Sequence, residues 1–238
     1  MLIVLASGYD EAARFWVESC TNSTNCTNLE VALLTPENFS KIGWCHYLGN
    51  RKNSTAVINE RVISVEEITG VLTRLPCVFE QELCQIVETD RAYVAAEMTA
   101  FLSSWLTELP SPILNQPTPI SLMGNNWRSP QWIYAASQVG MSVEPHDQSI
   151  RLQAESNPKK QPAQSIPVTV IGNRYIGEVE PKLGEQAQKL AQFAGVESLV
   201  VHYDRPEAEA NFLRADLWLD LKSSEISSAI LDYFITKN

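Results

Sequence analysis

The sequence predicts an α/β protein with a three-layer, parallel-sheet N-terminal domain followed by a smaller α/β region. Short apolar runs alternate with amphipathic segments near the start of the chain, an order that places helices on a parallel sheet. With 238 residues, 45% of them apolar and 19% charged, the chain can bury a sizeable core. A change in composition near residues 116–128 indicates a boundary, so we expect domains at 1–117 and 118–238.

Four apolar runs are predicted to be the strands of the N-terminal sheet. They are Met1–Ala6, Leu29–Leu33, Gly70–Arg74 and Pro112–Asn115. Between the second and third runs, two short apolar segments flank Asn59-Glu60 and predict a small hairpin. Thr35-Pro36 predicts the start of a helix, because threonine is a common cap and proline fits the first helical turn.

The predicted helices have clear start and stop signals. Asp10 can cap the first helix, whose apolar positions recur at helical spacing. The most regular helix runs from Asp90 to Glu108 with one continuous apolar face, and Pro110 ends it. Ser129-Pro130 begins a further helix, which ends near Gly140.

The C-terminal half predicts two more strands, at 167–171 and 198–202, with a helix between them. A final helix begins near Ser224. The stretch from 146 to 166 is polar and proline-containing, so we expect a loop there. This half therefore has fewer predicted elements than the N-terminal half.

The charge of the chain excludes some functions. Its formal net charge is −10 and its pI is about 4.8, which argues against a uniformly basic nucleic-acid surface and against an acidic membrane as partner. The apolar run at Met1–Ser7 is too short for a signal peptide or a membrane span. Five cysteines, an odd number, predict free thiols in a reducing cytoplasm.

Few motifs carry recognisable chemistry. The histidines lie far apart, and the sequence contains no Cys-x-x-Cys pair and no glycine-rich phosphate loop, so we predict no metal site from these residues. Asp204, Glu209 and Asn211 could be remnants of metal ligands, although a solvated acidic loop is the simpler interpretation. Glu97 lies close to the apolar face of the long helix and is expected to need a partner. Arg74 is the candidate for a structural ion pair with it, and a ligand-contacting role is the alternative.

Several of these segments resemble a known family. Gly70-Val-Leu-Thr-Arg-Leu-Pro76, Asp90-Arg-Ala-Tyr-Val-Ala-Ala-Glu97, Phe101-Leu-Ser-Ser-Trp-Leu106 and Pro112-Ile-Leu-Asn-Gln-Pro117 resemble the N-terminal domain of ATP-grasp ligases of the RimK and glutathione-synthetase type. Gly140-Met-Ser-Val-Glu-Pro145 resembles the end of the next helix in that family. The resemblance covers about residues 1–145 and implies a pre-ATP-grasp domain followed by a nucleotide-binding part.

The resemblance also implies where a ligand would bind and what the chain lacks. Its ligand-binding candidates are Arg74, Asp90, Arg91, Glu97, Asn115 and Arg128. Family members hold ATP with lysines from strands, and they hold magnesium with an Asp and a Glu-x-Asn on separate strands. Where they usually carry an Asn-Lys pair, this chain has Asn125-Asn126-Trp127-Arg128. Only 93 residues follow Pro145, so the grasp region is expected to be shortened and degenerate.

Three functional hypotheses follow. The first is a degenerate ATP-grasp-like protein, a pseudoenzyme that acts as an accessory, scaffold or small-ligand-binding protein, with a protein partner or a second copy of itself. The second is a minimal or split ATP-dependent carboxylate–amine ligase, the only hypothesis that requires Mg-ATP as cofactor. The third is a different enzyme that uses Arg74, Asp90, Arg91 or Glu97 in a cleft near Asn115. The sequence leaves the catalytic residues and the cofactor unknown and favours the first hypothesis.

Overall fold

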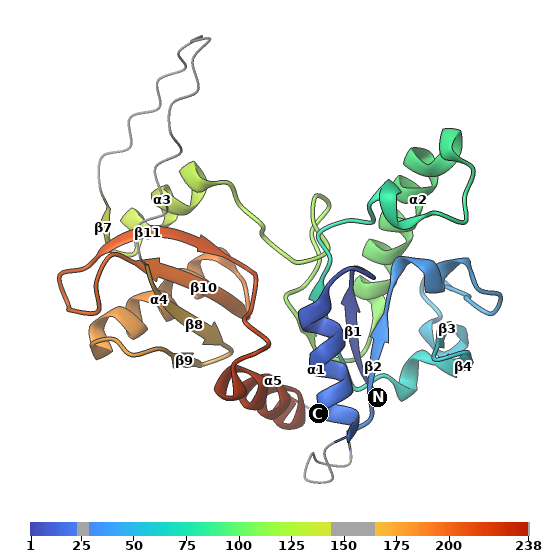
Figure 1. Cartoon of the computed structure of the whole chain (residues 1–238), viewed down its shortest axis with the longest axis horizontal. Helices are drawn as coiled ribbons and strands as arrows, with labels where there is room; N and C mark the ends of the chain where they lie inside the picture. Colours follow the sequence, from blue (N-terminus) through green and yellow to red (C-terminus); the bar gives the residue numbers. More distant parts are fainter. Residues whose placement is uncertain (23–28, 144–164, 238) are drawn as a thin grey trace. The chain divides into compact units, whose positions relative to one another are not determined.

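The computed structural model describes residues 1–22, 29–143 and 165–237. The chain forms two compact units (Figure 1). Unit 1 comprises Met1–Asn126 together with Trp218–Asn238, and unit 2 comprises Trp127–Leu217. The predicted loop at 146–166 lies almost entirely outside the described residues.

Unit 1 is built on a parallel sheet in the order β2-β1-β5-β6. Its strands are β1 (Leu2–Ala6), β2 (Val31–Leu34), β5 (Gly70–Arg74) and β6 (Ile113–Leu114). Every residue of β1 and β5 is buried, as expected for central strands with both faces covered. The α/β class and the parallel sheet predicted from the sequence are confirmed.

Three α-helices belong to unit 1. They are α1 (Glu11–Asn22), α2 (Glu88–Glu108) and α5 (Ser224–Lys237). The Asp10 carboxylate accepts a hydrogen bond from the Ala13 amide at 3.0 Å, so the predicted cap of α1 is confirmed. In α2, Ala95, Leu102, Trp105 and Leu106 are buried. The ring of Trp105 meets that of Trp44 edge to face, with 5.4 Å between centroids.

The remaining elements of unit 1 are short. The predicted hairpin consists of β3 (Thr55–Ile58) and β4 (Arg61–Ser64), and its turn residues Asn59 and Glu60 have φ values of 47° and 64°. Both turn residues are left-handed, as a two-residue hairpin turn requires. Four 3-10 helices complete the unit: η1 (Pro36–Ser40), η2 (Arg51–Asn53), η3 (Val65–Glu67) and η4 (Glu80–Glu82). The helix predicted after Thr35 is therefore one of these short turns.

Unit 2 contains one five-stranded sheet in the order β7-β11-β10-β8-β9. Its strands are β7 (Ser142–Val143), β8 (Ile166–Ile171), β9 (Arg174–Ile176), β10 (Ser198–Tyr203) and β11 (Asn211–Asp216). The pairs are antiparallel except for β11 with β7. Two helices pack on this sheet, α3 (Ser129–Gln138) and α4 (Pro181–Ala194). The sequence predicted β8, β10 and both helices but missed β7, β9 and β11.

The division into units differs from the predicted division at 117/118. Unit 1 continues to Asn126, and it also takes up the last segment of the chain from Trp218 onward. The physical reason is visible at Gly70, the first residue of β5. A Cβ atom added there would lie 2.3 Å from Cδ1 of Phe234 in α5, so the helix packs directly on the parallel sheet.

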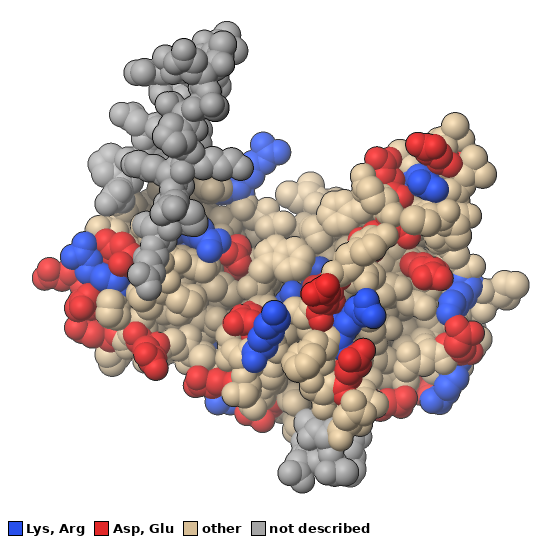
Figure 2. All heavy atoms as spheres, in the orientation of Figure 1, with Lys and Arg blue, Asp and Glu red and all other residues tan. Residues whose placement is uncertain are grey.

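The surface and the thiols fit an ordinary folded protein. Acidic and basic side chains are interspersed on the face shown in Figure 2. None of the helices in the described ranges is long and apolar enough to cross a lipid bilayer. No disulfide joins the four cysteines that lie in these ranges.

The buried Tyr203 links β10 to α4. Its hydroxyl donates to the Leu183 carbonyl at 2.9 Å, and burial raises the pKa of Tyr203 above its ordinary value of about 10. Below pH 10 the Tyr203 hydroxyl is neutral in both the folded and the unfolded chain, so its full contribution to stability is present. Above pH 10 the hydroxyl ionises in the unfolded chain first, and this contribution is lost as the pH rises. We expect Tyr203→Phe to lose about 1 kcal/mol at pH 8 and to narrow its deficit at pH 11, measured by urea unfolding. A deficit that is the same at both pH values would contradict this.

Candidate functional site

The carboxyl edge of the parallel sheet is the first place to look for a site, because open α/β folds bind ligands there. Arg74 is the last residue of β5, and Asn115 follows β6 directly. The two strands are paired, and the Thr73 hydroxyl donates to the Leu114 carbonyl at 3.1 Å. Asn115 is buried and has a φ of 40°. The structure therefore brings these two predicted residues to one edge.

Arg74 is held by groups of unit 1 itself. Its Nε donates to Oδ2 of Asp10 at 2.8 Å, and its Nη1 donates to the Leu219 carbonyl at 2.8 Å. The guanidinium carbon lies 5.2 Å from the ring centroid of Trp218, a cation–π distance. The Arg74 side chain is 7% exposed and that of Asp10 11%. Arg74 therefore forms a structural ion pair with Asp10 at the carboxyl edge of the sheet and connects this edge to the segment that contains Leu219.

The predicted ion pair between Arg74 and Glu97 is wrong. Glu97 is exposed on α2, and Arg74 pairs with Asp10 instead. The helix geometry explains the difference. Glu97 lies two residues after the buried Ala95, which places it about 200° around the helix and away from the core.

The other predicted candidates lie elsewhere. Asp90 is exposed in the first turn of α2, where it accepts a hydrogen bond from Thr89. Arg91 donates to the carbonyls of Ile86 and Cys84 and so fastens the loop before the helix. Arg128 is exposed at the start of α3 in unit 2. Within unit 1, the structure does not gather Asp90, Arg91 and Glu97 around Asn115.

A large cleft runs along α2 in unit 1. Its volume is about 970 Å³, within the range of ligand-binding clefts. One wall is α2 itself, which contributes small side chains from Ala92 to Glu108. The other wall is formed by residues 77–81 and 118–122. Small residues recur along α2, and this recurrence is the one sequence signal for the cleft, which the predicted sites do not include.

A polar cluster lies on the paired strands β10 and β11 of unit 2. His202 stands opposite Arg214 in the register. Nη1 of Arg214 lies 2.7 Å from Oδ2 of Asp216, and Nε2 of His202 lies 3.3 Å from the same oxygen. Nδ1 of His202 lies 3.1 Å from the Ser165 hydroxyl. Asp216 is therefore engaged by two nitrogen-bearing side chains.

The acidic segment proposed as remnant metal ligands is a turn stabilised by its own hydrogen bonds. Asp204 accepts hydrogen bonds from Arg205 and from both the amide and the side chain of Asn211. The hydrogen bond from Arg205 contributes most to lowering the pKa of Asp204, and those from Asn211 add to it. The Asn211 side chain donates to Asp204 through Nδ2 and accepts a hydrogen bond from the Ser142 hydroxyl through Oδ1, so both ends of the amide are engaged within unit 2. Across the described ranges, no group of three or more His, Cys, Asp or Glu side chains could hold a metal ion.

Comparisons with known proteins identify the fold. No family model matches the sequence, and no curated protein matches it. The structure is similar along its whole length to the macrocyclase MdnC from Microcystis aeruginosa MRC, crystallised with the precursor peptide MdnA, with a TM-score of 0.69, 12% identity and 100% of both chains covered. It is also similar to a RiPP-associated ATP-grasp ligase from Chryseobacterium gregarium in complex with ADP and a leader and core peptide, with a TM-score of 0.66 and 13% identity over 100% of this chain and 97% of the other.

A RimK-domain ATP-grasp protein from Sphaerobacter thermophilus DSM 20745 is similar over 99% of this chain and all of its own, with a TM-score of 0.52 and 10% identity. The chain therefore has the fold of the ATP-grasp ligases, as the resemblance of its N-terminal segments implied. At these identities the likeness establishes the fold, and the chemistry must be judged from the residues of this chain.

Among the described residues of unit 2, the cluster of His202, Arg214 and Asp216 does not fit a magnesium ion. Arg214 and Asp216 lie two residues apart on β11, so both side chains are on the same face of the strand. His202 stands opposite Arg214 on β10, the neighbouring strand. A divalent cation beside Asp216 would meet the positive charge of Arg214, which already lies 2.7 Å from that carboxylate.

Proposed function

We propose that this chain is a degenerate ATP-grasp-like protein that acts by binding, as an accessory protein without ATP-dependent ligase activity of its own. The observation that carries the proposal is the cluster of His202, Arg214 and Asp216. It holds one carboxylate, that of Asp216, between an arginine and a histidine on the paired strands β10 and β11. Oxygen-rich ligand sets hold Mg²⁺, and this set is dominated by nitrogen donors and positive charge.

A peptide is the ligand class that we propose. Two of the structurally similar ligases were crystallised with peptides, MdnC with its precursor and the Chryseobacterium gregarium enzyme with a leader and core peptide. Unit 1 has a cleft of about 970 Å³, and its lining includes none of the residues of the strand cluster. A protein of this fold could therefore lose nucleotide chemistry and keep a surface that binds a peptide.

Thermal unfolding with Mg-ATP tests this proposal. A ligand that binds only the folded state at 100 times its Kd stabilises that state by about 2.7 kcal/mol. For a chain of this size, such a stabilisation corresponds to a rise in Tm of about 5–11 °C. We expect no rise with saturating Mg-ATP. A rise of several degrees would overturn the proposal and support the ligase hypothesis.

A gain-of-binding variant tests the role of the cluster itself. Arg214→Glu removes the guanidinium and places a second carboxylate beside Asp216 and opposite His202. We expect Mn²⁺ to raise the Tm of this variant by a few degrees and to leave the native chain unchanged. Arg205→Glu is the matched control, because Arg205 lies in the exposed turn before β11 and outside the cluster. Equal stabilisation of the native chain and both variants would refute the assignment.

A further inference from the structure

The cleft along α2 is lined on the helix side by small side chains. Its α2 wall consists of alanine, serine and threonine residues that recur every three or four positions, with Glu108 at the carboxyl end of the helix. The lining from Ala92 to Glu108 spans about 24 Å at the rise of an α-helix. An extended chain of about seven residues covers that length. Small side chains at this spacing allow a peptide backbone to approach the helix closely.

The wall opposite α2 is fixed in place by hydrogen bonds. The Val78 amide donates to the Thr99 hydroxyl at 3.0 Å, which ties the loop after β5 to the middle of α2. The Leu122 amide donates to the Pro76 carbonyl at 2.8 Å, and residues Thr118 and Ser121 form a bridge with each other. A cleft held in this way needs little reordering when it binds a ligand, which lowers the entropic cost of binding.

The charge of the lining is of one sign. Glu80 and Glu108 contribute carboxylates, and no lysine or arginine is among the described residues that line the cleft. Phe79 and Pro119 add apolar surface on the wall opposite α2, and Phe79 is 42% exposed. The two carboxylates therefore favour a ligand with basic side chains. The small side chains of the α2 wall favour a ligand with an extended backbone.

We propose that the α2 cleft binds an extended, positively charged peptide segment with its backbone along Ala96 and Ala100. This inference rests on the proposed function, because it gives the location and the charge of the peptide ligand. It concerns unit 1 alone and uses none of the residues of the His202 cluster.

Fluorescence polarisation with two labelled nonapeptides tests the proposal. One probe alternates lysine and serine, and the other replaces each lysine with glutamate. We expect the lysine probe to bind and the glutamate probe to bind at least about tenfold more weakly. Ala100→Trp, which fills the cleft from the α2 wall at an exposed position, should weaken the lysine probe by about tenfold or more. Glu97→Trp, on the same helix but outside the lining, should leave its affinity within about twofold.

A second variant that changes only a charge tests the same cleft independently, in case Ala100→Trp does not fold. Glu80→Gln should weaken the lysine probe several-fold, and Glu88→Gln, exposed in the first turn of α2 and outside the lining, should not. Equal affinity of the native chain, Ala100→Trp and Glu80→Gln would overturn the cleft assignment. If the probe does not bind and Mg-ATP causes no thermal shift, the cleft assignment fails alone. A shift with Mg-ATP contradicts the proposed function instead.

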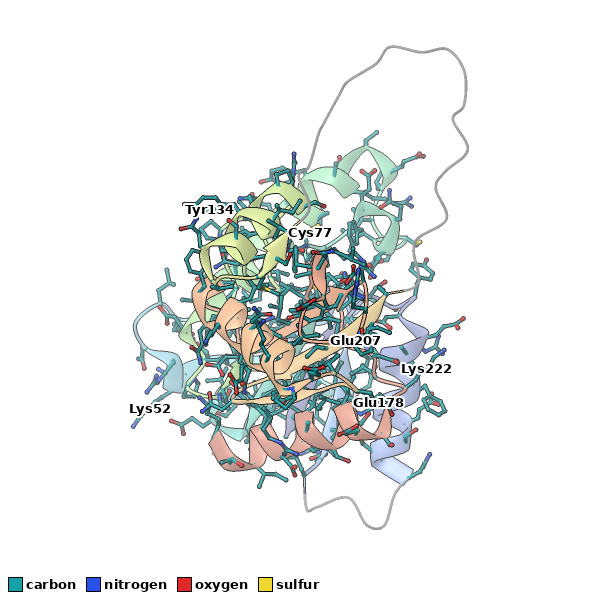
Figure 3. All side chains as sticks on the ribbon, turned by 90° about the vertical axis from the view of Figure 1, so that its left-hand side faces the viewer. Lys52, Cys77, Tyr134, Glu178, Glu207 and Lys222 are labelled. Atoms are coloured by element: carbon teal, nitrogen blue, oxygen red, sulfur yellow. The ribbon has the colours of Figure 1, made fainter. Side chains whose placement is uncertain are left out.

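Cysteine alkylation gives a second readout of the same site. Cys77, labelled in Figure 3, lines the cleft, and burial together with the nearby Glu82 charge raises the pKa of its thiol. Cys84 is exposed and outside the lining. We expect the bound lysine probe to slow alkylation of Cys77 about fivefold or more and to leave Cys84 unchanged. Equal slowing of both thiols would indicate binding elsewhere on the acidic surface.

Discussion

Replacing Arg74 with methionine is expected to lower the free energy of unfolding by about 3–5 kcal/mol. The change leaves the largely buried Asp10 carboxylate, 11% exposed, without its guanidinium partner, and it removes the donor to the Leu219 carbonyl. Removing one member of a buried ion pair is costly, because the remaining charge stays desolvated without compensation. Urea unfolding followed by circular dichroism measures the loss.

Two further variants separate the charge from other effects of this change. Arg61→Met breaks the exposed pair with Glu30, whose atoms are 3.8 Å apart, and should cost less than about 1 kcal/mol. Asp10→Asn in the Arg74→Met background removes the stranded charge, keeps an oxygen that can cap α1, and should recover part of the stability. If Arg74→Met were as mild as Arg61→Met, the buried pair would not hold this edge of the sheet.

The elements with strong local signals were predictable from the sequence. Leu2–Ala6 is an uninterrupted apolar run, and it forms the fully buried β1. The predicted helix Asp90–Glu108 repeats its apolar residues at helical spacing, and it lies within α2 (Glu88–Glu108). In both cases the pattern of apolar residues along the segment itself indicates the element. These predictions therefore need no knowledge of contacts with distant parts of the chain.

The missed strands lack such local signals. β7 has two residues and exists because it pairs with Asn211 and Phe212 of β11. β11 follows a polar turn and carries Arg214 and Asp216 on a strand of mixed burial, so its apolar pattern is weak. Their formation depends on pairing partners far away in the sequence, which is a tertiary effect rather than a local propensity.

The candidate site residues also divide into those that local sequence patterns place correctly and those whose contacts depend on distant parts of the chain. Arg74 and Asn115 were placed at the strand ends from local pattern, and the structure brings both to the same sheet edge. The partner of Arg74 was predicted wrongly, because Asp10 is 64 residues away and its role as a helix cap concealed its second contact. His202 joins Arg214 and Asp216 only through the β10–β11 register, which no spacing in the sequence reveals.

Truncating Phe234 is the second change for which we expect a large effect. Phe234 is fully buried in α5, and its ring lies against Gly70 at the start of β5. Phe234→Ala should lower the free energy of unfolding by about 3–5 kcal/mol, because it removes apolar contacts and leaves a cavity at the sheet. Urea unfolding measures the loss. Phe193→Ala is the control, since Phe193 is 49% exposed on α4, and it should cost about 1 kcal/mol or less.

The contact with Gly70 makes this prediction sharper than a simple cavity argument. A Cβ at position 70 would lie 2.3 Å from Cδ1 of Phe234, so Gly70→Ala is expected to cost about 1–3 kcal/mol through overpacking. Phe234→Leu removes the ring that the new methyl group would meet. The free energy of unfolding that the double variant loses should therefore be smaller than the sum of the two single-variant losses by at least about 1 kcal/mol. Strict additivity would mean that α5 does not rest on β5, and the last segment of the chain would then not be part of the first unit.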